Sequence, residues 1–323
     1  MGPGGRVGAN GAAPDGRPGL SGAVWMADMP APLRPADIRA ARADRPRQRD
    51  RDVADALGIS EAALVAAHVG VTGPRRAWWI TPDPASLADA LARCGPVMAL
   101  TRNRSAVHEV TGRYGRYEGD AEAGRLLGGI ALEIRPHHWQ HAFAVELRGA
   151  QGTLCSLQVF DGAGQAVHKV YPQEAGARWA ALLDALGTGE DRQDVTPEAA
   201  EAVRMEPSKP VGAPLPKTAI VAALEAARAD QVPLEITVGN PGAVQRFTGR
   251  IASLMPMGPW QNVMDPGFNL HLRADHLAEA RLDPGEDACL RGFDEAGGEI
   301  LRLSGGEEDR TAWQAVVSAI AER

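Results

Sequence analysis

Asn103-Arg-Ser-Ala-Val-His-Glu-Val-Thr-Gly-Arg113 and Asn240-Pro-Gly-Ala-Val-Gln-Arg-Phe-Thr-Gly-Arg250 carry Asn, Ala, Val, Thr, Gly and Arg at the same positions. Three further pairs follow in the same order and at nearly the same offset: Leu132–Arg135 with Leu270–Arg273, Leu157–Gly164 with Leu290–Gly297, and Trp179 with Trp313. Matches that keep one order and nearly one spacing predict a tandem duplication of a half-protein. The boundary between two such halves is a natural place for a ligand site.

Length and composition agree with two globular halves. The chain has 323 residues, of which 44% are hydrophobic and 23% charged, and this suits two cores of roughly 100–150 residues each. The net charge of −7 argues against general binding of polyphosphates. No apolar segment approaches the roughly 20 residues that cross a bilayer. We therefore expect a protein that is not membrane-embedded and has no nucleic-acid partner.

Each half is expected to be a helix-flanked antiparallel sheet, which gives an α+β fold. In each copy a segment with helical spacing runs into an alternating strand, and Phe-Asp-x-Ala-Gly marks a hairpin, because Asp and Gly supply turn conformations. The segments are helices at 84–94 and 217–230, strands at 97–101 and 234–238, hairpins at 160–164 and 293–297, and closing helices at 177–186 and 311–323.

The composition also predicts the boundaries of the halves. Residues 1–33 are rich in Gly, Pro and Ala and are expected to be a disordered N-terminal extension. The first repeat then covers residues 34–186 and the second covers residues 217–323. Between them, residues 187–216 are first acidic and then rich in Pro, and they lack apolar periodicity, as is typical of a linker.

Asp52-Val-Ala-Asp-Ala-Leu-Gly-Ile-Ser60 and the helix that follows it resemble a helix-turn-helix, which can place its second helix in a DNA groove. That second helix, however, offers mainly Ala and Val after Glu61, with almost nothing to contact a base edge or a phosphate. The structural interpretation is therefore preferred. Signature motifs of P-loop, Rossmann, zinc-protease and α/β-hydrolase enzymes do not occur in the sequence.

Three polar positions are candidates for a site. Arg102 ends the strand at 97–101, where its guanidinium could donate to a carboxylate or approach a planar ligand. His108 corresponds to Gln245 in the second copy. A polar side chain at this position in both copies suggests either a strand face turned toward a cleft or water, or a structural hydrogen bond.

Arg135-Pro-His-His-Trp-Gln-His141 concentrates three histidines. Imidazole is a common metal and haem-iron ligand. His137 and His138 are adjacent, however, and adjacent side chains of an extended chain point to opposite faces. Because no Cys or carboxylate lies at ligand spacing, a connection between strands is preferred over a dedicated metal site.

Several longer motifs of the chain resemble one known family. They are Leu100-Thr-Arg-Asn-Arg-Ser-Ala-Val-His-Glu109, Ser156-Leu-Gln-Val-Phe-Asp-Gly-Ala-Gly-Gln-Ala-Val-His-Lys-Val-Tyr171, Val238-Gly-Asn-Pro-Gly-Ala-Val-Gln-Arg-Phe-Thr-Gly249 and the segment from Met257 to Arg273. Together they look like the bacterial haemin-degrading and haem-trafficking proteins of the HemS, HmuS and ChuS group. The resemblance implies a duplicated fold, a cytoplasmic location and haem held between the halves. It also implies an inner-membrane haem ABC importer as the donor of haem and a haem oxygenase or a reductase as a further partner.

The resemblance also implies site residues. An arginine of the Thr-Arg-Asn motif lies on one side of the iron, and it corresponds to Arg102. The family's axial histidine stands in a helical Asp-x-His-x-Phe-Phe segment between the halves, whereas residues 187–216 contain no histidine. The candidates for a substitute ligand are His108, His137, His138 and His276, and no metal other than haem iron is expected.

Two departures in the second half concern charge. The family's basic Arg-Lys-Pro-Thr stretch is replaced by Leu282-Asp-Pro-Gly-Glu-Asp287, and its late Gly-x-Arg segment has become Gly305-Gly-Glu-Glu-Asp-Arg310. We therefore expect a haem-utilisation protein that binds haem for trafficking or degradation at an atypical or weakened site, in which Arg102 and the cleft-facing His108 and Gln245 take part. The alternative is a non-enzymatic binding or regulatory module on the same scaffold that has lost haem binding.

Overall fold

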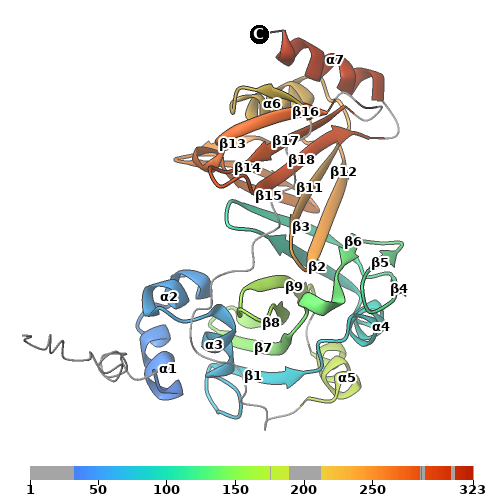
Figure 1. The fold of residues 1–323 in the computed structure, drawn as a ribbon. Helices are drawn as coiled ribbons and strands as arrows, with labels where there is room; N and C mark the ends of the chain where they lie inside the picture. Colours follow the sequence, from blue (N-terminus) through green and yellow to red (C-terminus); the bar gives the residue numbers. More distant parts are fainter. Residues whose placement is uncertain are drawn as a thin grey trace, which may run out of the picture. The chain divides into compact units, whose positions relative to one another are not determined.

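The structure is a computed structural model that describes residues 33–174, 176–188, 212–283, 285, 288–306 and 310–322. These residues form two nine-stranded antiparallel sheets with short helices around them (Figure 1). The α+β class and the tandem duplication are confirmed. The predicted N-terminal extension, apart from its last residue, and most of the predicted linker lie outside the described residues.

From β1 and β10 onward the elements follow one order in both repeats, and helices α1 to α3 precede the first repeat's sheet strands. The helices are α1 (Pro35–Ala43), α2 (Asp50–Leu57), α3 (Glu61–Ala66), α4 (Pro84–Cys94), α5 (Ala177–Leu186), α6 (Ala219–Ala229) and α7 (Arg310–Ala321), with short 3₁₀ turns η1 (Pro136–His138) and η2 (Ala274–His276). The strands of the first repeat are β1 (Arg75–Ile80), β2 (Pro96–Arg102), β3 (Ala106–Arg113), β4 (Arg116–Gly119), β5 (Gly124–Leu127), β6 (Ala131–Ile134), β7 (His141–Gly149), β8 (Gly152–Phe160) and β9 (Ala166–Pro172). Those of the second are β10 (Ala213–Leu215), β11 (Leu234–Asn240), β12 (Ala243–Gly249), β13 (Met255–Met257), β14 (Trp260–Asp265), β15 (Phe268–Arg273), β16 (Glu279–Asp283), β17 (Cys289–Phe293) and β18 (Glu299–Gly305).

The two repeats exchange strands. The first sheet has the order β1-β7-β8-β9-β2-β3-β15-β14-β13, and the second has the order β10-β16-β17-β18-β11-β12-β6-β5-β4. Three strands of each copy therefore extend the sheet of the other, and β15 pairs with β3 as β6 pairs with β12. Each sheet is thus built from six strands of one copy and completed by three strands of the other, because these three strands find their partners across the repeat boundary.

The hydrophobic cores nevertheless follow the repeats. Buried side chains of α4 and α5 pack with those of the first repeat's strands, including β5 and β6, and only Ala243 joins from the other copy. Side chains of α6 and α7 pack in the same way with the second repeat's strands, including β14 and β15. Each half therefore buries mainly its own apolar residues, while its backbone hydrogen bonds continue into the other half.

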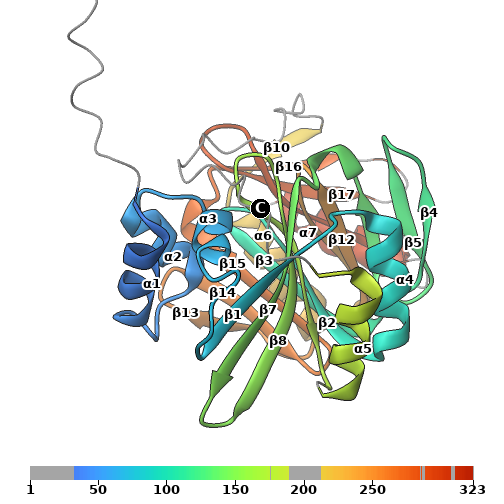
Figure 2. The same ribbon diagram turned by 90° about the horizontal axis from the view of Figure 1, so that it is seen from below.

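The N-terminal helices α1 to α3 form a group at one side of the first sheet, in which α3 packs against the sheet and α1 and α2 pack against α3 (Figure 2). Gly58, with a φ of 66°, ends α2, and Ser60 begins α3 by accepting a hydrogen bond from the Ala63 amide at 3.1 Å. Every residue from Glu61 to Val65 is buried. Because α3 packs against β1 and β7, it presents no free face to a DNA groove.

The hairpin prediction is confirmed in both copies. The Oδ1 atom of Asp161 accepts two backbone amides at 3.0 and 2.8 Å, and Asp294 does the same at 2.9 and 2.8 Å. Part of the predicted linker, Ala213–Leu215, forms β10 at the edge of the second sheet. No helix within the described ranges is long and apolar enough to cross a membrane.

Candidate ligand cavity between the repeats

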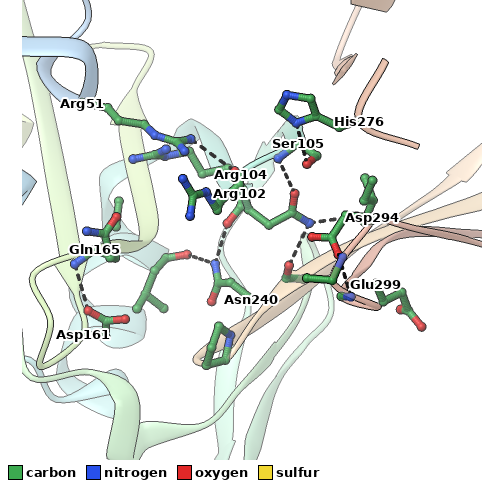
Figure 3. A pocket seen from close by; sticks show the side chains of 18 of the residues that line it. Arg51, Arg102, Arg104, Ser105, Asp161, Gln165, Asn240, His276, Asp294 and Glu299 are labelled. Carbon is green, nitrogen blue, oxygen red and sulfur yellow. Dashed lines mark hydrogen bonds between the residues drawn. The ribbon is translucent and has the colours of Figure 1, made fainter. Parts of the chain in front are cut away.

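A cavity of about 540 Å³ lies where the two repeats meet. Its walls come from matching segments of both copies, namely the turn after β2 and its counterpart at the end of β11, and the hairpin turns that follow β8 and β17. Arg51 of α2 and His276 of η2 complete the wall (Figure 3). The duplication therefore places a cavity between the halves, as the sequence predicted.

Asn103 holds the turn after β2 against the other repeat. Its Nδ2 donates to the carbonyl oxygens of Gly239 at 3.1 Å and Ile300 at 2.8 Å, and its Oδ1 accepts two amides of its own turn. Asn240 repeats the arrangement, with bonds of 2.9 and 2.7 Å to carbonyls of the first repeat. The asparagine that occurs in both copies therefore joins the two repeats by hydrogen bonds at the cavity wall.

One side of the cavity is basic. Arg51, Arg102 and Arg104 lie together there (Figure 3). Burial, followed by the nearby charge of Arg102, lowers the pKa of Arg51. The guanidinium of Arg102 donates through Nη2 to the buried carboxylate of Glu61. This side favours an anionic group on a ligand.

Carboxylates also line the cavity, and hydrogen bonds or ion pairs within the protein engage several of them. Asp161 caps its hairpin turn and is almost fully buried, and burial raises its pKa. Asp294 caps the matching turn. Glu299 forms ion pairs with Arg302 and, at 3.6 Å, with Arg291. The negative charge of this side is therefore partly compensated within the protein.

His276 is the histidine among the predicted ligand candidates that lines the cavity. Its Nδ1 lies 3.0 Å from the hydroxyl oxygen of Ser105, which itself belongs to the turn after β2. If Nδ1–H donates to that hydroxyl, Nε2 carries a free electron pair, which is the arrangement of a metal-ligating histidine with a supporting hydrogen bond. The geometry therefore suits His276 for binding an iron atom.

The other predicted positions lie elsewhere. His137 and His138 belong to η1, which connects β6 to β7, and neither lines the cavity. His138 ends η1 of the first repeat as His276 ends η2 of the second, so the two histidines occupy equivalent places. Of the two alternatives for His108 and Gln245, the structure agrees with the structural hydrogen bond and not with a cleft-facing position, because both side chains are 0% exposed and they bond to each other.

His108 and Gln245 meet each other between the sheets, where their hydrogen-bond directions can be assigned. Nε2 of His108 lies 3.1 Å from the Ile236 carbonyl, which only accepts, so Nε2 carries the proton. Burial lowers the pKa of His108 to about 4, so the ring is neutral and its Nδ1 accepts from the Gln245 amide at 3.1 Å. The same amide nitrogen donates to the Ala99 carbonyl at 3.0 Å.

The chain of hydrogen bonds continues into the first repeat. The Gln245 Oε1 atom accepts from the Thr101 hydroxyl at 2.9 Å, and the oxygen of this hydroxyl then accepts from Nδ1 of His168 at 2.9 Å. Nε2 of neutral His168 accepts from the Tyr114 hydroxyl at 2.5 Å. Burial lowers the pKa of His168 to about 3. These hydrogen bonds form one continuous chain, with every donor and acceptor assigned, that connects the two sheets. Thr101, which immediately precedes Arg102, lies at its centre.

Sequence reasoning found Arg102 but missed other wall residues. Arg51, Arg104 and Ser105 come together with His276 only because α2, the turn after β2 and η2 meet in the fold. The repeated Asn103 and Asn240 were visible as a pattern, and their presence in both copies could have marked them as wall residues. No local pattern distinguishes Arg51 from the other arginines near it in the sequence.

These features define the class of protein: a tandem α+β repeat with exchanged strands and a ligand cavity between its halves. The family model described as the haemin-degrading HemS/ChuX domain matches residues 58–186 and 198–320. The chain belongs to this family.

Known relatives match along nearly their whole length. The chain is 30% identical to the hemin transport protein HmuS of Yersinia pestis, with 88% of this chain and 96% of that protein aligned. It is 31% identical to the hemin transport protein HemS of Yersinia enterocolitica, with 85% and 93% aligned. Among solved structures, holo-PhuS, a heme-binding protein from Pseudomonas aeruginosa, has a TM-score of 0.75 at 29% identity, covering 88% of this chain and 99% of that one. ChuS, an E. coli heme oxygenase, has a TM-score of 0.74 at 25% identity, with the same coverage.

Proposed function

We propose that this protein binds haem in the cavity between its repeats and serves cytoplasmic haem utilisation. The proposal rests chiefly on one observation: Arg102 of the Thr-Arg-Asn motif and His276 line the same cavity. Haem-handling relatives such as the heme-binding protein PhuS support the choice of ligand.

The residues of the cavity fit the chemical needs of haem. An imidazole is a suitable ligand for haem iron, and His276 supplies one whose second nitrogen lies at the Ser105 hydroxyl. Arg51 and Arg104 can receive the haem carboxylates. Apolar surface for the porphyrin ring comes from Val167, Ile300 and Pro241.

In this arrangement the protein binds, orients and shields the ligand. Ser105 fixes the ring orientation of His276, and Asn103 and Asn240 keep the two walls at a constant spacing. Bound haem supplies the redox chemistry that degradation requires. We propose carriage of haem, received from an inner-membrane ABC importer, as the main role. Degradation is a further activity that depends on a reductase or another electron donor.

The acidic residues of the cavity favour a second candidate. Five carboxylates line it, from Asp161, Asp275, Asp294, Glu295 and Glu299, and negative charge opposes the binding of a ligand with carboxylates of its own. A binding or regulatory module that has lost haem accounts for this feature, and the following titration separates the two candidates.

The test is an absorbance titration of the purified full chain with ferric haemin, repeated with ascorbate. We expect a saturable Soret shift in the wild type, and a changed spectrum with at least about tenfold weaker binding in His276→Ala. Arg102→Ala should also alter the spectrum. His138→Ala is the matched control, because it removes the equivalent histidine outside the cavity.

Each outcome has a distinct meaning. Decay of the Soret band on reduction adds degradation to binding. A wild-type spectrum in His276→Ala would remove this histidine from the proposed site. A wild-type protein that leaves the haemin spectrum unchanged would reject haem binding and support the second candidate.

A further inference from the structure

A second cavity of about 540 Å³ lies between the N-terminal helices and the face of the first sheet. Eight Arg and Lys side chains line it against five Asp and Glu, although the whole chain carries a net charge of −7. It shares six lining residues with the first cavity, and most of its lining is its own; the shared residues are Arg51, Arg102, Asn103, Arg104, Ser105 and His276. The second cavity is therefore locally basic in a protein that is acidic as a whole.

The excess is concentrated in a buried group of six side chains, which we call the cationic cluster: Arg42, Asp50, Glu61, Arg75, Arg102 and Lys169. Asp50 accepts from Arg42 at 2.9 Å and from two nitrogens of Arg75 at 3.0 and 2.5 Å. Glu61 accepts from Lys169 at 2.6 Å and from Arg102. Two carboxylates therefore form ion pairs with four cationic side chains.

These charges are largely removed from water. The side chains of the cationic cluster are between 4% and 15% exposed. Burial raises the pKa of Asp50, but the charge and hydrogen bonds of Arg75 outweigh it and hold the pKa at about 2. Burying a charge without a counter-charge is costly, and the two carboxylates leave two of the four positive charges uncompensated.

Two buried polar atoms on side chains that line this cavity also lack a partner among the described residues. They are Nε of Arg75 and Oε1 of Gln158, and both residues are buried. Gln158 lies directly opposite Lys169 across β8 and β9, and its Nε2 donates to the Ser156 hydroxyl at 3.0 Å. Both unpartnered atoms are themselves shut off from the cavity, so its attraction for an anion rests on the charge of the cationic cluster.

We propose that the second cavity is an anion-binding site, in which the cationic cluster receives a carboxylate or phosphate group. An anion of either kind supplies the missing negative charge. Two sources share this chemistry. One is free phosphate, and the other is a carboxylate of haem bound in the first cavity, which has Arg51 and Arg104 in common with the second. Only the second source rests on the proposed function.

Lys169→Met is the informative variant. It removes one of the uncompensated charges and leaves Glu61 paired with Arg102, so the fold retains a neutral pair at this position. Lys169 does not line the first cavity. Arg302→Met is the matched control, because Arg302 occupies the equivalent place on β18 of the second repeat and has Glu299 as its partner.

The first arm is calorimetric titration of the full chain with inorganic phosphate at low ionic strength, with sodium chloride at matched ionic strength as reference. We expect saturable phosphate binding in the wild type, at least about tenfold weaker binding in Lys169→Met, and no change in Arg302→Met. This result supports the site with a free oxyanion as occupant.

The second arm compares haemin with haemin dimethyl ester, which lacks free carboxylates. If a haem carboxylate is the occupant, the wild type should prefer haemin by at least about tenfold, and Lys169→Met should lose this preference. If haemin and its ester both fail to bind, the proposed haem function fails and the phosphate arm alone decides. The anion site is refuted if phosphate does not bind and Lys169→Met leaves the haemin-to-ester preference unchanged.

Discussion

Thr101→Val tests the directed hydrogen-bond chain that joins the two sheets. The Thr101 hydroxyl donates to Gln245 and accepts from His168, and its side chain is 0% exposed. Replacing the hydroxyl by a methyl group of similar size leaves Oε1 of Gln245 and Nδ1–H of His168 without partners in a dry interior. Each unsatisfied buried group costs about 1–3 kcal/mol, so the free energy of unfolding should fall by about 2–6 kcal/mol.

Urea denaturation followed by circular dichroism measures this change. With a denaturant dependence of about 3 kcal/mol per molar for a chain of this size, the midpoint should fall by roughly 0.7–2 M. Thr101→Ser keeps the hydroxyl and should stay close to the wild type. Thr111→Val is the control, because Thr111 is exposed on β3 and its substitution should change stability by no more than about 0.5 kcal/mol.

The refuting result is a Thr101→Val protein whose midpoint equals that of Thr111→Val. The chain of hydrogen bonds would then contribute nothing measurable to the stability of the interface. A large loss in Thr101→Ser as well would show that side-chain packing at this position, and not the hydrogen bonds, dominates.

Two more predictions concern the interface between the repeats. Burial holds the pKa of His108 at about 4 and of His168 at about 3, below the ordinary 6.5. The unfolded chain therefore binds more protons in this range, and the free energy of unfolding should fall by about 2–3 kcal/mol per pH unit on going from pH 6.2 to 5.2. Urea titrations at both pH values check this, and equal midpoints would contradict it. Asn240→Ala should lower stability by about 2–4 kcal/mol, because it removes two turn acceptors and two bonds to the first repeat. Asn240→Asp keeps the acceptors and should lose less, as measured by thermal denaturation, and equal losses in both variants would assign the effect to the donors alone.

Local sequence was informative wherever a structure depends on neighbours along the chain. The hairpin turns were predictable because Asp161 and Asp294 bind amides within four residues of themselves. The terminal helix of the first repeat, α5, spans the predicted residues 177–186. These elements depend on capping and turn hydrogen bonds between residues that are close in the sequence.

The candidate site was predictable in part. Arg102 lines the cavity as its motif suggested, whereas His108 and Gln245 form the structural hydrogen bond that the sequence left open beside a cleft-facing position. A polar residue on a strand can face solvent, or it can be buried and form a hydrogen bond. The sequence does not distinguish these cases, because the hydrogen-bond partner is known only from the fold. Of the histidine candidates, only the fold separates His276, which lines the cavity, from His138 at the equivalent position.

The sequence by itself determined the duplication, the α+β class and the family, because these are recorded as repeated residues and local periodicity. Only the tertiary structure decided that β4 to β6 and β13 to β15 extend each other's sheets. Strand pairing is selected by backbone hydrogen bonds, which are the same for every residue type, and by packing partners that are distant in the sequence. The same long-range choice brought α2, the turn after β2 and η2 together around one cavity, and set the cationic cluster beside it.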